Sequence, residues 1–252
     1  MSTKKPFHLS LAGNIATGKS TLYKQVCLWY EAAGAKVFRL IEDVPRMKET
    51  TVRGEVVKPL ALSYENPQRY KGSTQLYFYS LRYFEHERIQ REAAEYQANH
   101  PDQDVYIISE RSAPDDYIFY RYGCAMTDEE GKSIMDPMDS VNYELVRQMR
   151  PLVEVDMHIY VKTDPEECQR RANARKRSED ASLPLDLFVD IHDLHEQVYN
   201  GKTLDHPVPQ DPIHPSKVLV LTNDTPVSKK TRESFKHPLL AEIHKYVACT
   251  CV

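Results

Sequence analysis

One stretch of eight residues near the N-terminus constrains the fold of this chain most. Residues 13–20 read Gly-Asn-Ile-Ala-Thr-Gly-Lys-Ser and fit G-x-x-x-x-G-K-[ST], the pattern of a phosphate-binding loop. The apolar segment 7–12 before it predicts a short buried strand, and apolar spacing in 20–31 predicts a helix after it. A glycine-containing turn before an ordinary helix is the alternative, but the strand, loop and helix together favour a nucleotide site.

The residue types of this loop suit phosphate binding. Glycines let the backbone wrap closely around phosphates with successive N–H groups pointing inward, and the helix start adds its positive dipole end. We expect Lys19 to reach the β- and γ-phosphates and Ser20 to ligate Mg²⁺. The residues expected to bind the nucleotide are Gly13, Asn14, Ile15, Ala16, Thr17, Gly18, Lys19, Ser20, Thr21 and, at a later strand end, Asp224.

Length and composition narrow the class of protein. A chain of 252 residues can bury a sizeable core in one domain, for which we expect residues 1–252, with a frayed tail at 248–252. The formal net charge of −4 implies no general attraction to nucleic acid or membranes, and no apolar run is long enough to span a bilayer. Five scattered cysteines and the absence of a signal or transit segment predict a cytoplasmic location.

The rest of the chain alternates between strand and helix patterns. Strands are predicted at 7–12, 36–41, 104–109, 153–161 and 217–221. Helices are predicted at 20–31, 67–99, 115–122, 138–150, from Pro165 onward, 185–199 and 230–247, and residues 45–66 as a loop or short helix. This order predicts an α/β fold in which helices flank a five-stranded parallel sheet.

Charged residues follow two of the predicted strands directly. Glu42 comes after the second strand, and Glu110 and Arg111 come after the third. Ligands bind outside the carboxyl ends of strands in open α/β sheets, so we expect these side chains beside the phosphate loop. Glu110 and Arg111 suit contacts to Mg²⁺-bound water and phosphate. For Glu42 the strand-end position alone leaves a solvated acid as an equal alternative.

The long helix predicted at 67–99 carries two polar residues on one face. Gln75 and Arg82 lie seven positions apart, two helical turns, and could form a base-reading surface. A polar stripe facing water explains the same spacing. Beyond Glu85 the helix becomes charged, and we expect it to emerge into solvent.

An arginine-rich segment follows the fourth predicted strand. Arg171 and Arg175 are four positions apart and project together, and Arg177 follows. These arginines could form a solvated basic face or a nucleic-acid-binding patch. In a protein with a phosphate-binding loop, they could instead form a lid over the phosphates, at about residues 171–182. Arginine suits the lid because its fork is planar and permanently charged. His192 and His195 lie further on at i,i+3; nothing completes a metal site, so we expect surface or packing histidines.

These motifs, in this order, resemble the deoxynucleoside kinase family over about residues 7–224. Residues 13–21 are nearly identical to the family's phosphate loop, and 110–112 are its Glu-Arg-Ser motif. Residues 41–44 resemble the family's Glu-Pro-Val segment, which implies that Glu42 is the base acting on the sugar 5′-hydroxyl. The resemblance implies a P-loop kinase fold with an arginine-rich lid, ATP as phosphate donor, Mg²⁺, and a homodimer through the long helices.

The same resemblance implies the substrate contacts. Tyr64 falls on the tyrosine that contacts the 3′-hydroxyl, Gln75 on the base-reading glutamine, and Asp180 where an acid holds the 3′-hydroxyl. Arg171, Arg175 and Arg177 match the lid arginines. The catalytic residues are therefore expected to be Lys19, Glu42, Arg111, Arg171, Arg175 and Arg177. The metal ligands are expected to be Ser20 and Glu110, and the substrate contacts Glu42, Tyr64, Gln75, Arg82, Arg111, Asp115, Asp116 and Asp180.

The chain departs from the family pattern in places. Met47 stands where a tryptophan is usual, and Thr74 where a phenylalanine often packs beside the glutamine. The spacer after the Glu-Arg-Ser motif is one residue short, so either Asp115 or Asp116 is the base-pocket aspartate. Family members specific for deoxycytidine or deoxyguanosine carry an Arg and an Asp there, whereas thymidine-accepting members carry uncharged residues.

The function expected from these residues is ATP-dependent phosphorylation of a deoxynucleoside at its 5′-hydroxyl. Arg82 with Asp115 or Asp116 implies that deoxycytidine or a purine deoxynucleoside is preferred over thymidine. A nucleoside-monophosphate kinase of the thymidylate type shares the loop and lid and is the alternative, and a non-kinase P-loop ATPase is a more remote one. No nucleic-acid or membrane partner is expected.

Overall fold

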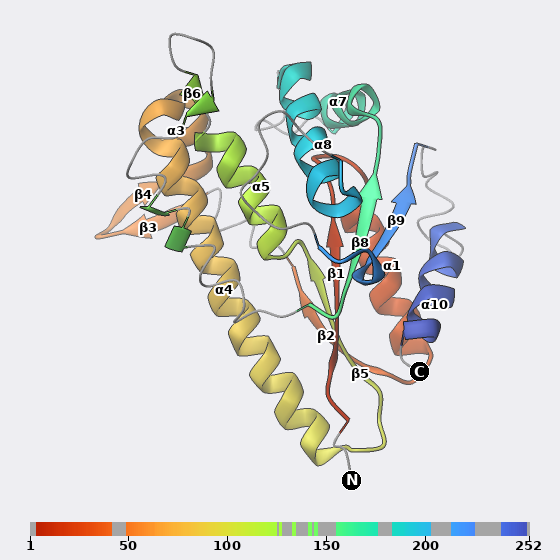
Figure 1. Ribbon diagram of the computed structural model, residues 1–252. Helices are drawn as coiled ribbons and strands as arrows, with labels where there is room; N and C mark the ends of the chain where they lie inside the picture. The colour runs from red at the N-terminus through yellow and green to blue at the C-terminus, as the bar shows by residue number, and fades with distance from the viewer. Residues whose placement is uncertain are drawn as a thin grey trace.

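Five parallel strands form the central sheet of this protein (Figure 1). The computed structural model describes residues 4–41, 49–124, 126–127, 133–134, 141–142, 144–145, 155–175, 183–202, 213–224 and 238–250. The strands are β1 (Phe7–Ala12), β2 (Lys36–Leu40), β5 (Val105–Glu110), β8 (Met157–Lys162) and β9 (Val218–Thr222). Their order across the sheet is β2-β5-β1-β8-β9, and all neighbours are parallel. The predicted five-stranded parallel sheet is confirmed.

Helices cover both faces of this sheet, which is why its strands read as nearly continuous buried runs. On one face lie α1 (Lys19–Ala32) and α10 (Pro238–Thr250), packed on an apolar core that includes Leu9 and Leu11 of β1. On the other lie α4 (Pro67–Asn99), α5 (Ala113–Cys124) and α8 (Leu185–Asn200), with α7 (Pro165–Ala174) against α8 (Figure 1). Among the described helices, none is both long and apolar enough to cross a membrane.

Two helices begin at capping residues that can be recognised in the sequence. Asn66 caps α4, its side chain accepting a hydrogen bond from the amide of Arg69, and Pro67 occupies the first turn. Asp164 caps α7 by accepting from the amides of Glu166 and Glu167. Both helices begin where the sequence predicts. Strand β1 lies at the predicted residues 7–12 and α8 also begins at the predicted residue 185, whereas the other described helices and strands differ from the prediction by one to several residues at one or both ends.

The segment predicted as a loop or short helix also contains a hairpin. Strands β3 (Thr50–Val52) and β4 (Glu55–Val57) pair antiparallel before the short helix α3 (Pro59–Glu65). The turn is Arg53-Gly54, both at positive φ (52° and 84°), as a two-residue hairpin turn requires. Three-residue strands are too short to show periodicity. Further small elements are β6 (Met126–Thr127), β7 (Ser133–Ile134) and the 3₁₀ turn η2 (Pro215–Lys217).

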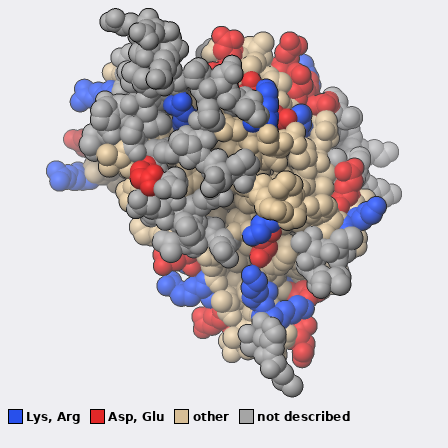
Figure 2. All heavy atoms as spheres, viewed as in Figure 1, with Lys and Arg blue, Asp and Glu red and all other residues tan. Residues whose placement is uncertain are grey.

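The second half of α4 does not emerge into solvent, contrary to the prediction from its charges. Ile89 and Ala93 are buried against Leu40 of β2 and against Val105 and Ile107 of β5. The charged residues occupy the outer side, where Arg88 pairs with Glu85 and Glu92. Figure 2 shows basic and acidic side chains interspersed over the described surface of one face. Ile89 and Ala93, one turn apart, together with the partly buried Tyr96, thus hold this charged half of α4 on the sheet.

Candidate functional site

The loop between β1 and α1 depends on its two glycines. Gly13 has φ 139° and Gly18 has φ 95°, both outside the range that side chains tolerate easily. A Cβ on Gly13 would lie 2.5 Å from the carbonyl oxygen of Val161, and one on Gly18 would lie 2.7 Å from Nδ2 of Asn223. The loop therefore packs directly on the ends of the neighbouring strands β8 and β9, with no room for a larger residue.

Side chains from distant parts of the chain hold this loop in shape. Asn223, just after β9, donates from Nδ2 to the carbonyl oxygen of Thr17 at 2.6 Å. Asn14 donates from Nδ2 to the carbonyl of Phe188 on α8 at 2.7 Å, and its Oδ1 accepts from the amide of Ile15 at 2.7 Å. Both asparagines are buried. A loop fixed in this way is preorganised, so its amide groups need little rearrangement to receive an anion.

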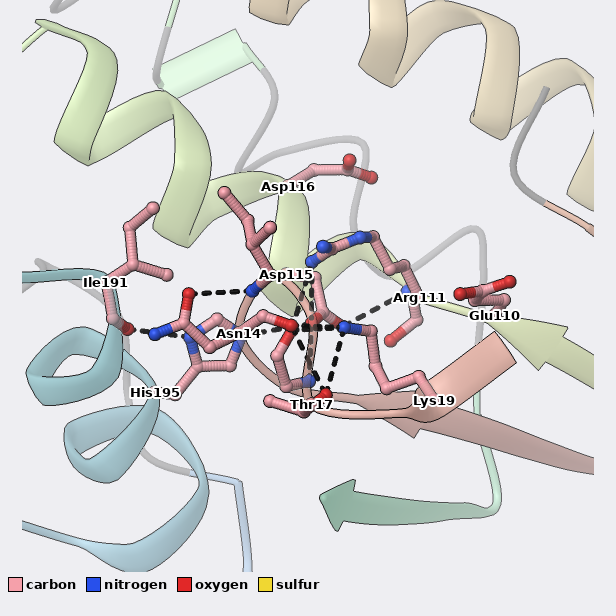
Figure 3. Close-up of polar contacts among 12 residues, drawn as sticks. Asn14, Thr17, Lys19, Glu110, Arg111, Asp115, Asp116, Ile191 and His195 are labelled. Atoms are coloured by element: carbon pink, nitrogen blue, oxygen red, sulfur yellow. Dashed lines mark hydrogen bonds and ion pairs between the residues drawn. The ribbon is translucent and has the colours of Figure 1, made fainter. Parts of the chain in front are cut away.

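Lys19 begins α1 with its ammonium group turned back over the loop. Its Nζ donates to the carbonyl oxygens of Gly13 at 2.8 Å and Asn14 at 2.5 Å (Figure 3). The side chain is buried, so its positive charge acts in a setting of low dielectric. This places a cation where phosphate oxygens would meet the loop.

Ser20 and Glu110 form an oxygen pair at the edge of the loop. Ser20 Oγ donates to Glu110 Oε1 at 2.5 Å, and Glu110, the last residue of β5, is buried. Hydroxyl and carboxylate oxygens are the donors that Mg²⁺ prefers, and Mg²⁺ typically takes one or two protein ligands together with water and substrate phosphates. The described residues hold no cluster of three or more His, Cys, Asp or Glu fit for a metal. The Ser20–Glu110 pair thus fits Mg²⁺ held jointly with a nucleotide.

Arg111 brings a guanidinium to the same loop from the end of β5. Its backbone has φ 68°, a left-handed conformation that is uncommon for a residue with a side chain. The amide of Arg111 donates to the carbonyl of Leu11 at 2.8 Å. The guanidinium lies 4.3 Å from the centre of the Phe119 ring and donates from Nη1 to the carbonyl of Gly13 at 3.3 Å. The hydrogen bond from the Arg111 amide and the contacts of its guanidinium maintain this strained backbone, which directs the side chain to the loop.

The two adjacent aspartates of α5 point to different partners. Asp116 accepts from Arg82 Nε at 2.7 and 3.0 Å, and Arg82 Nη1 also donates to the carbonyl of Glu110 at 3.3 Å. Asp115 instead faces the phosphate loop, where Oδ1 accepts from the amide of Gly13 at 3.3 Å. The partner of Arg82, which the short spacer left open, is therefore Asp116. Figure 3 shows Asp115 turned toward the phosphate loop and Asp116 turned away from it.

The Arg82–Asp116 pair is buried beside the predicted base-reading surface. The side chains of Arg82 and Asp116 are only 7% and 8% exposed. Gln75 lies two turns earlier on α4 and is half-buried. Thr74, which stands where the family often has phenylalanine, is buried and donates from its hydroxyl to the carbonyl of Pro59 at 3.4 Å. Thr74 therefore helps to join α4 to α3 and occupies less volume than an aromatic ring.

Of the predicted lid arginines, Arg171 reaches the phosphate loop. It donates to the carbonyl oxygens of Asn223 at 2.8 Å and Thr17 at 3.3 Å, and its Nε pairs with Glu167 at 2.6 Å. Arg175 is the cap residue just after α7 and is exposed. Arg177 lies outside the described residues, so an arginine-rich lid remains a prediction.

Comparison with known proteins establishes the family. The model of the deoxynucleoside kinase family matches residues 9–247 of this chain. The chain belongs to the deoxynucleoside kinase family. It is therefore a phosphotransferase with the P-loop kinase fold, and the predicted fold class and enzyme class are confirmed.

Three relatives show the range of this family. Deoxycytidine kinase of Bos taurus is 30% identical over 207 residues, which cover 78% of this chain and 76% of the relative. Thymidine kinase 2, mitochondrial, of Homo sapiens is 29% identical over 189 residues, covering 75% and 63%. Deoxyguanosine kinase, mitochondrial, of Xenopus laevis is 25% identical over 202 residues, covering 77% and 74%. Because their names specify different bases, membership of the deoxynucleoside kinase family does not determine the base.

The structure does not describe several of the predicted site residues of this kinase. Glu42, Arg177 and Asp180 lie outside the described residues, and for Tyr64 only its place in α3 is described. Asp224 is exposed and accepts from the amide of Asp164 at 3.2 Å, which joins β9 to the start of α7.

The sequence analysis missed three residues that support the phosphate loop. Asn223 follows the last strand, and strand-end position could have indicated it, as it did Glu110. His195 and Tyr199 of α8 contact Asp115 from a distant part of the chain. Tyr199 stands in no motif that could have indicated it, and the spacing of His195 indicated only a surface or packing role.

Proposed function

We propose that this kinase transfers the γ-phosphoryl group of ATP to the 5′-hydroxyl of a deoxynucleoside, and that it uses deoxycytidine or a purine deoxynucleoside better than thymidine. Membership of the family supports the reaction class. The buried Arg82–Asp116 pair carries the preference for the base. Lys19, Ser20, Glu110 and Arg111, gathered at one loop, support a triphosphate donor.

In the proposed mechanism the protein positions charges and does little covalent chemistry. The amides of loop 13–18 and the ammonium of Lys19 bind the donor phosphates, and Arg111 stabilises negative charge that develops on the transferring group. Glu42 accepts the proton of the 5′-hydroxyl, whose oxygen attacks the γ-phosphorus in line while the bond from the γ-phosphorus to the β–γ bridging oxygen breaks and ADP leaves. When bound, Mg²⁺ would neutralise charge on the β- and γ-oxygens, and Ser20 and Glu110 would hold it. Further positive charge around the donor phosphates would come from Arg171, Arg175 and Arg177.

The base preference follows from what Asp116 and Arg82 can pair with. A carboxylate only accepts hydrogen bonds, so it suits the exocyclic amino group of cytosine or adenine and opposes the O4 acceptor of thymine. Guanine is harder to accommodate because its O6 would have to face Arg82. An unmade or repulsive buried polar contact costs about 1–3 kcal/mol, which is roughly a tenfold to hundredfold selectivity. Thr74 is smaller than phenylalanine and leaves more space for the base, which favours the larger purines.

The test of this proposal is a panel of the four deoxynucleosides with Mg·ATP, scored for kcat/KM and for the product formed. We expect monophosphates, with thymidine used least well. If thymidine is the best of the four, the interpretation of Arg82 and Asp116 is wrong while the kinase assignment stands. A diphosphate made from a monophosphate acceptor would replace the proposal with a nucleoside-monophosphate kinase, and ATP hydrolysis without any acceptor would replace it with an ATPase.

We also propose that the enzyme is a cytoplasmic homodimer that pairs through α4. The support on α4 is Phe84, whose aromatic side chain is 65% exposed and so available to a second copy of the chain. Buried free thiols at Cys27 and Cys168 suit a reducing compartment. Sedimentation of the wild type and of Phe84→Glu tests the dimer: we expect a dimer for the first and a monomer for the second. A wild-type monomer would contradict it.

A further inference from the structure

Asp115 lies at the centre of a fully buried polar cluster behind the phosphate loop. Four groups donate to its carboxylate: the amides of Gly13 and Ser112, each at 3.3 Å, the hydroxyl of Tyr199 at 2.9 Å, and Nε2 of His195 at 3.2 Å. The side chains of both Asp115 and His195 are 0% exposed. A carboxylate so enclosed cannot contact a substrate, so the predicted substrate-binding role does not suit Asp115.

The cluster fixes the position of Gly13, the first residue of the loop. The amide of Gly13 donates to Asp115, and its carbonyl accepts from Arg111 Nη1 at 3.3 Å and from Lys19 Nζ at 2.8 Å. Arg111 Nη1 in turn lies 3.6 Å from Asp115 Oδ1. Asp115 therefore sets the backbone of the loop and also the direction of the guanidinium that serves it (Figure 3).

His195 is held between two acceptors. Its Nδ1 is 2.7 Å from the carbonyl oxygen of Ile191, and its Nε2 faces the carboxylate of Asp115. A carbonyl and a carboxylate can only accept, so His195 donates to both at once only when it carries a proton on each ring nitrogen. The pair then holds one proton more than a neutral imidazole and a carboxylate would. This proton joins α8 to the loop.

Burial and charge act on this proton in opposite directions. Burial outweighs the hydrogen bond and charge of Asp115, so the pKa of the His195 imidazole lies below its ordinary value and the proton is lost on the acid side of neutrality. Although burial by itself would raise it, the pKa of Asp115 is held well below its ordinary range by His195, Arg111 and Lys19. The titratable and charged groups around the pair are Arg111 after β5, Lys19 of α1, Tyr160 and His158 of β8, and Tyr199 and Glu196 of α8.

We propose that Asp115, His195 and Tyr199 form a positioning unit that orders the phosphate loop for the triphosphate donor. The inference rests on the proposed use of ATP. None of the three touches a substrate; they act through Gly13 and Arg111. The unit works fully only while His195 keeps both hydrogen bonds, so donor binding weakens as the pH rises and the shared proton is lost.

Tyr199→Phe tests the unit with little change in packing, because it removes one hydroxyl and keeps the ring stacked on Tyr160 and His195. We expect KM for ATP to rise about fivefold or more, since one buried hydrogen bond is lost, with KM for the deoxynucleoside nearly unchanged. Tyr160→Phe is the matched control: its ring belongs to the same stack, but Glu196, and not Asp115, has the larger influence on its hydroxyl. Equal effects of the two variants on KM for ATP would overturn the proposal.

The pH dependence is the second readout. In the wild type we expect kcat/KM for ATP to fall as the pH rises through the pKa of the pair. In Asp115→Asn the side-chain amide can donate to a neutral His195, so this decline should vanish, although kcat/KM should be lower by roughly tenfold or more at every pH. Superimposable profiles for wild type and Asp115→Asn would refute the shared proton. Absence of any transfer in the wild type would instead reject the proposed function.

Discussion

At the scale of single residues, the charged side chains of this site are buried and largely shielded from solvent. Lys19, Arg111 and Glu110 are all buried, although charged side chains usually lie on the protein surface. Buried charge costs stability unless it is paired, and here each group has backbone or side-chain partners at the loop. Such charges need little reorganisation when phosphate arrives, which is the basis of electrostatic catalysis.

Lys19→Ala tests the role of the loop lysine. The γ-phosphate would lose its nearest cation, so we expect phosphoryl transfer to be abolished. Binding of the deoxynucleoside, measured by calorimetry or fluorescence without ATP, should survive because its proposed contacts come from other elements. Near-normal turnover in this variant would be incompatible with the phosphate-loop assignment.

Glu42→Gln tests the proposed general base. The amide keeps the shape of the side chain but cannot take a proton, so kcat should fall by about 10² to 10⁴ while the melting temperature stays unchanged. The measurement is steady-state kcat with saturating ATP and deoxynucleoside. An unchanged kcat would remove Glu42 from this role.

At the scale of elements, two predicted lid arginines, one in α7 and one just after it, differ in character. Arg171 contacts the carbonyls of Thr17 and Asn223 and so helps to fix the loop, whereas Arg175 is exposed at the helix end. Arg175→Ala should lower kcat more than it raises KM for the deoxynucleoside, because a lid arginine acts on charge that develops in the transition state. Arg171→Ala should in addition lower the melting temperature. A rise in KM alone for Arg175→Ala would identify a ground-state contact or a bystander.

The elements differ in how far the sequence could predict them. The strand, loop and helix around residues 7–32 could be predicted because long apolar runs and a spaced glycine motif are local signals. The β3–β4 hairpin could not, since three-residue strands carry no periodicity. The support of Asp115 could not either, because His195 and Tyr199 are 80 and 84 positions away in sequence and meet it only when α8 packs beside α5.

At the scale of the whole molecule, one buried ion pair connects specificity with stability. Arg82 of α4 and Asp116 of α5 join two helices on the same face of the sheet, and Arg82 also reaches the carbonyl of Glu110 at the end of β5. The pair proposed to choose the base thus lies in the contact between α4, α5 and the sheet. A substitution there changes substrate choice and folding together, and an experiment has to separate the two.

A double variant can separate them. Arg82→Met alone leaves the Asp116 carboxylate buried without its partner, so we expect unfolding to become easier by about 3–5 kcal/mol. Adding Asp116→Ala removes the stranded charge, so much of this loss should return, as measured by urea denaturation. With both charges gone, the acceptor that opposes thymine O4 is absent, and kcat/KM for thymidine relative to deoxycytidine should rise by roughly tenfold or more. A double variant that recovers stability while keeping the wild-type ranking of the four deoxynucleosides would show that this pair holds the helices together and does not read the base.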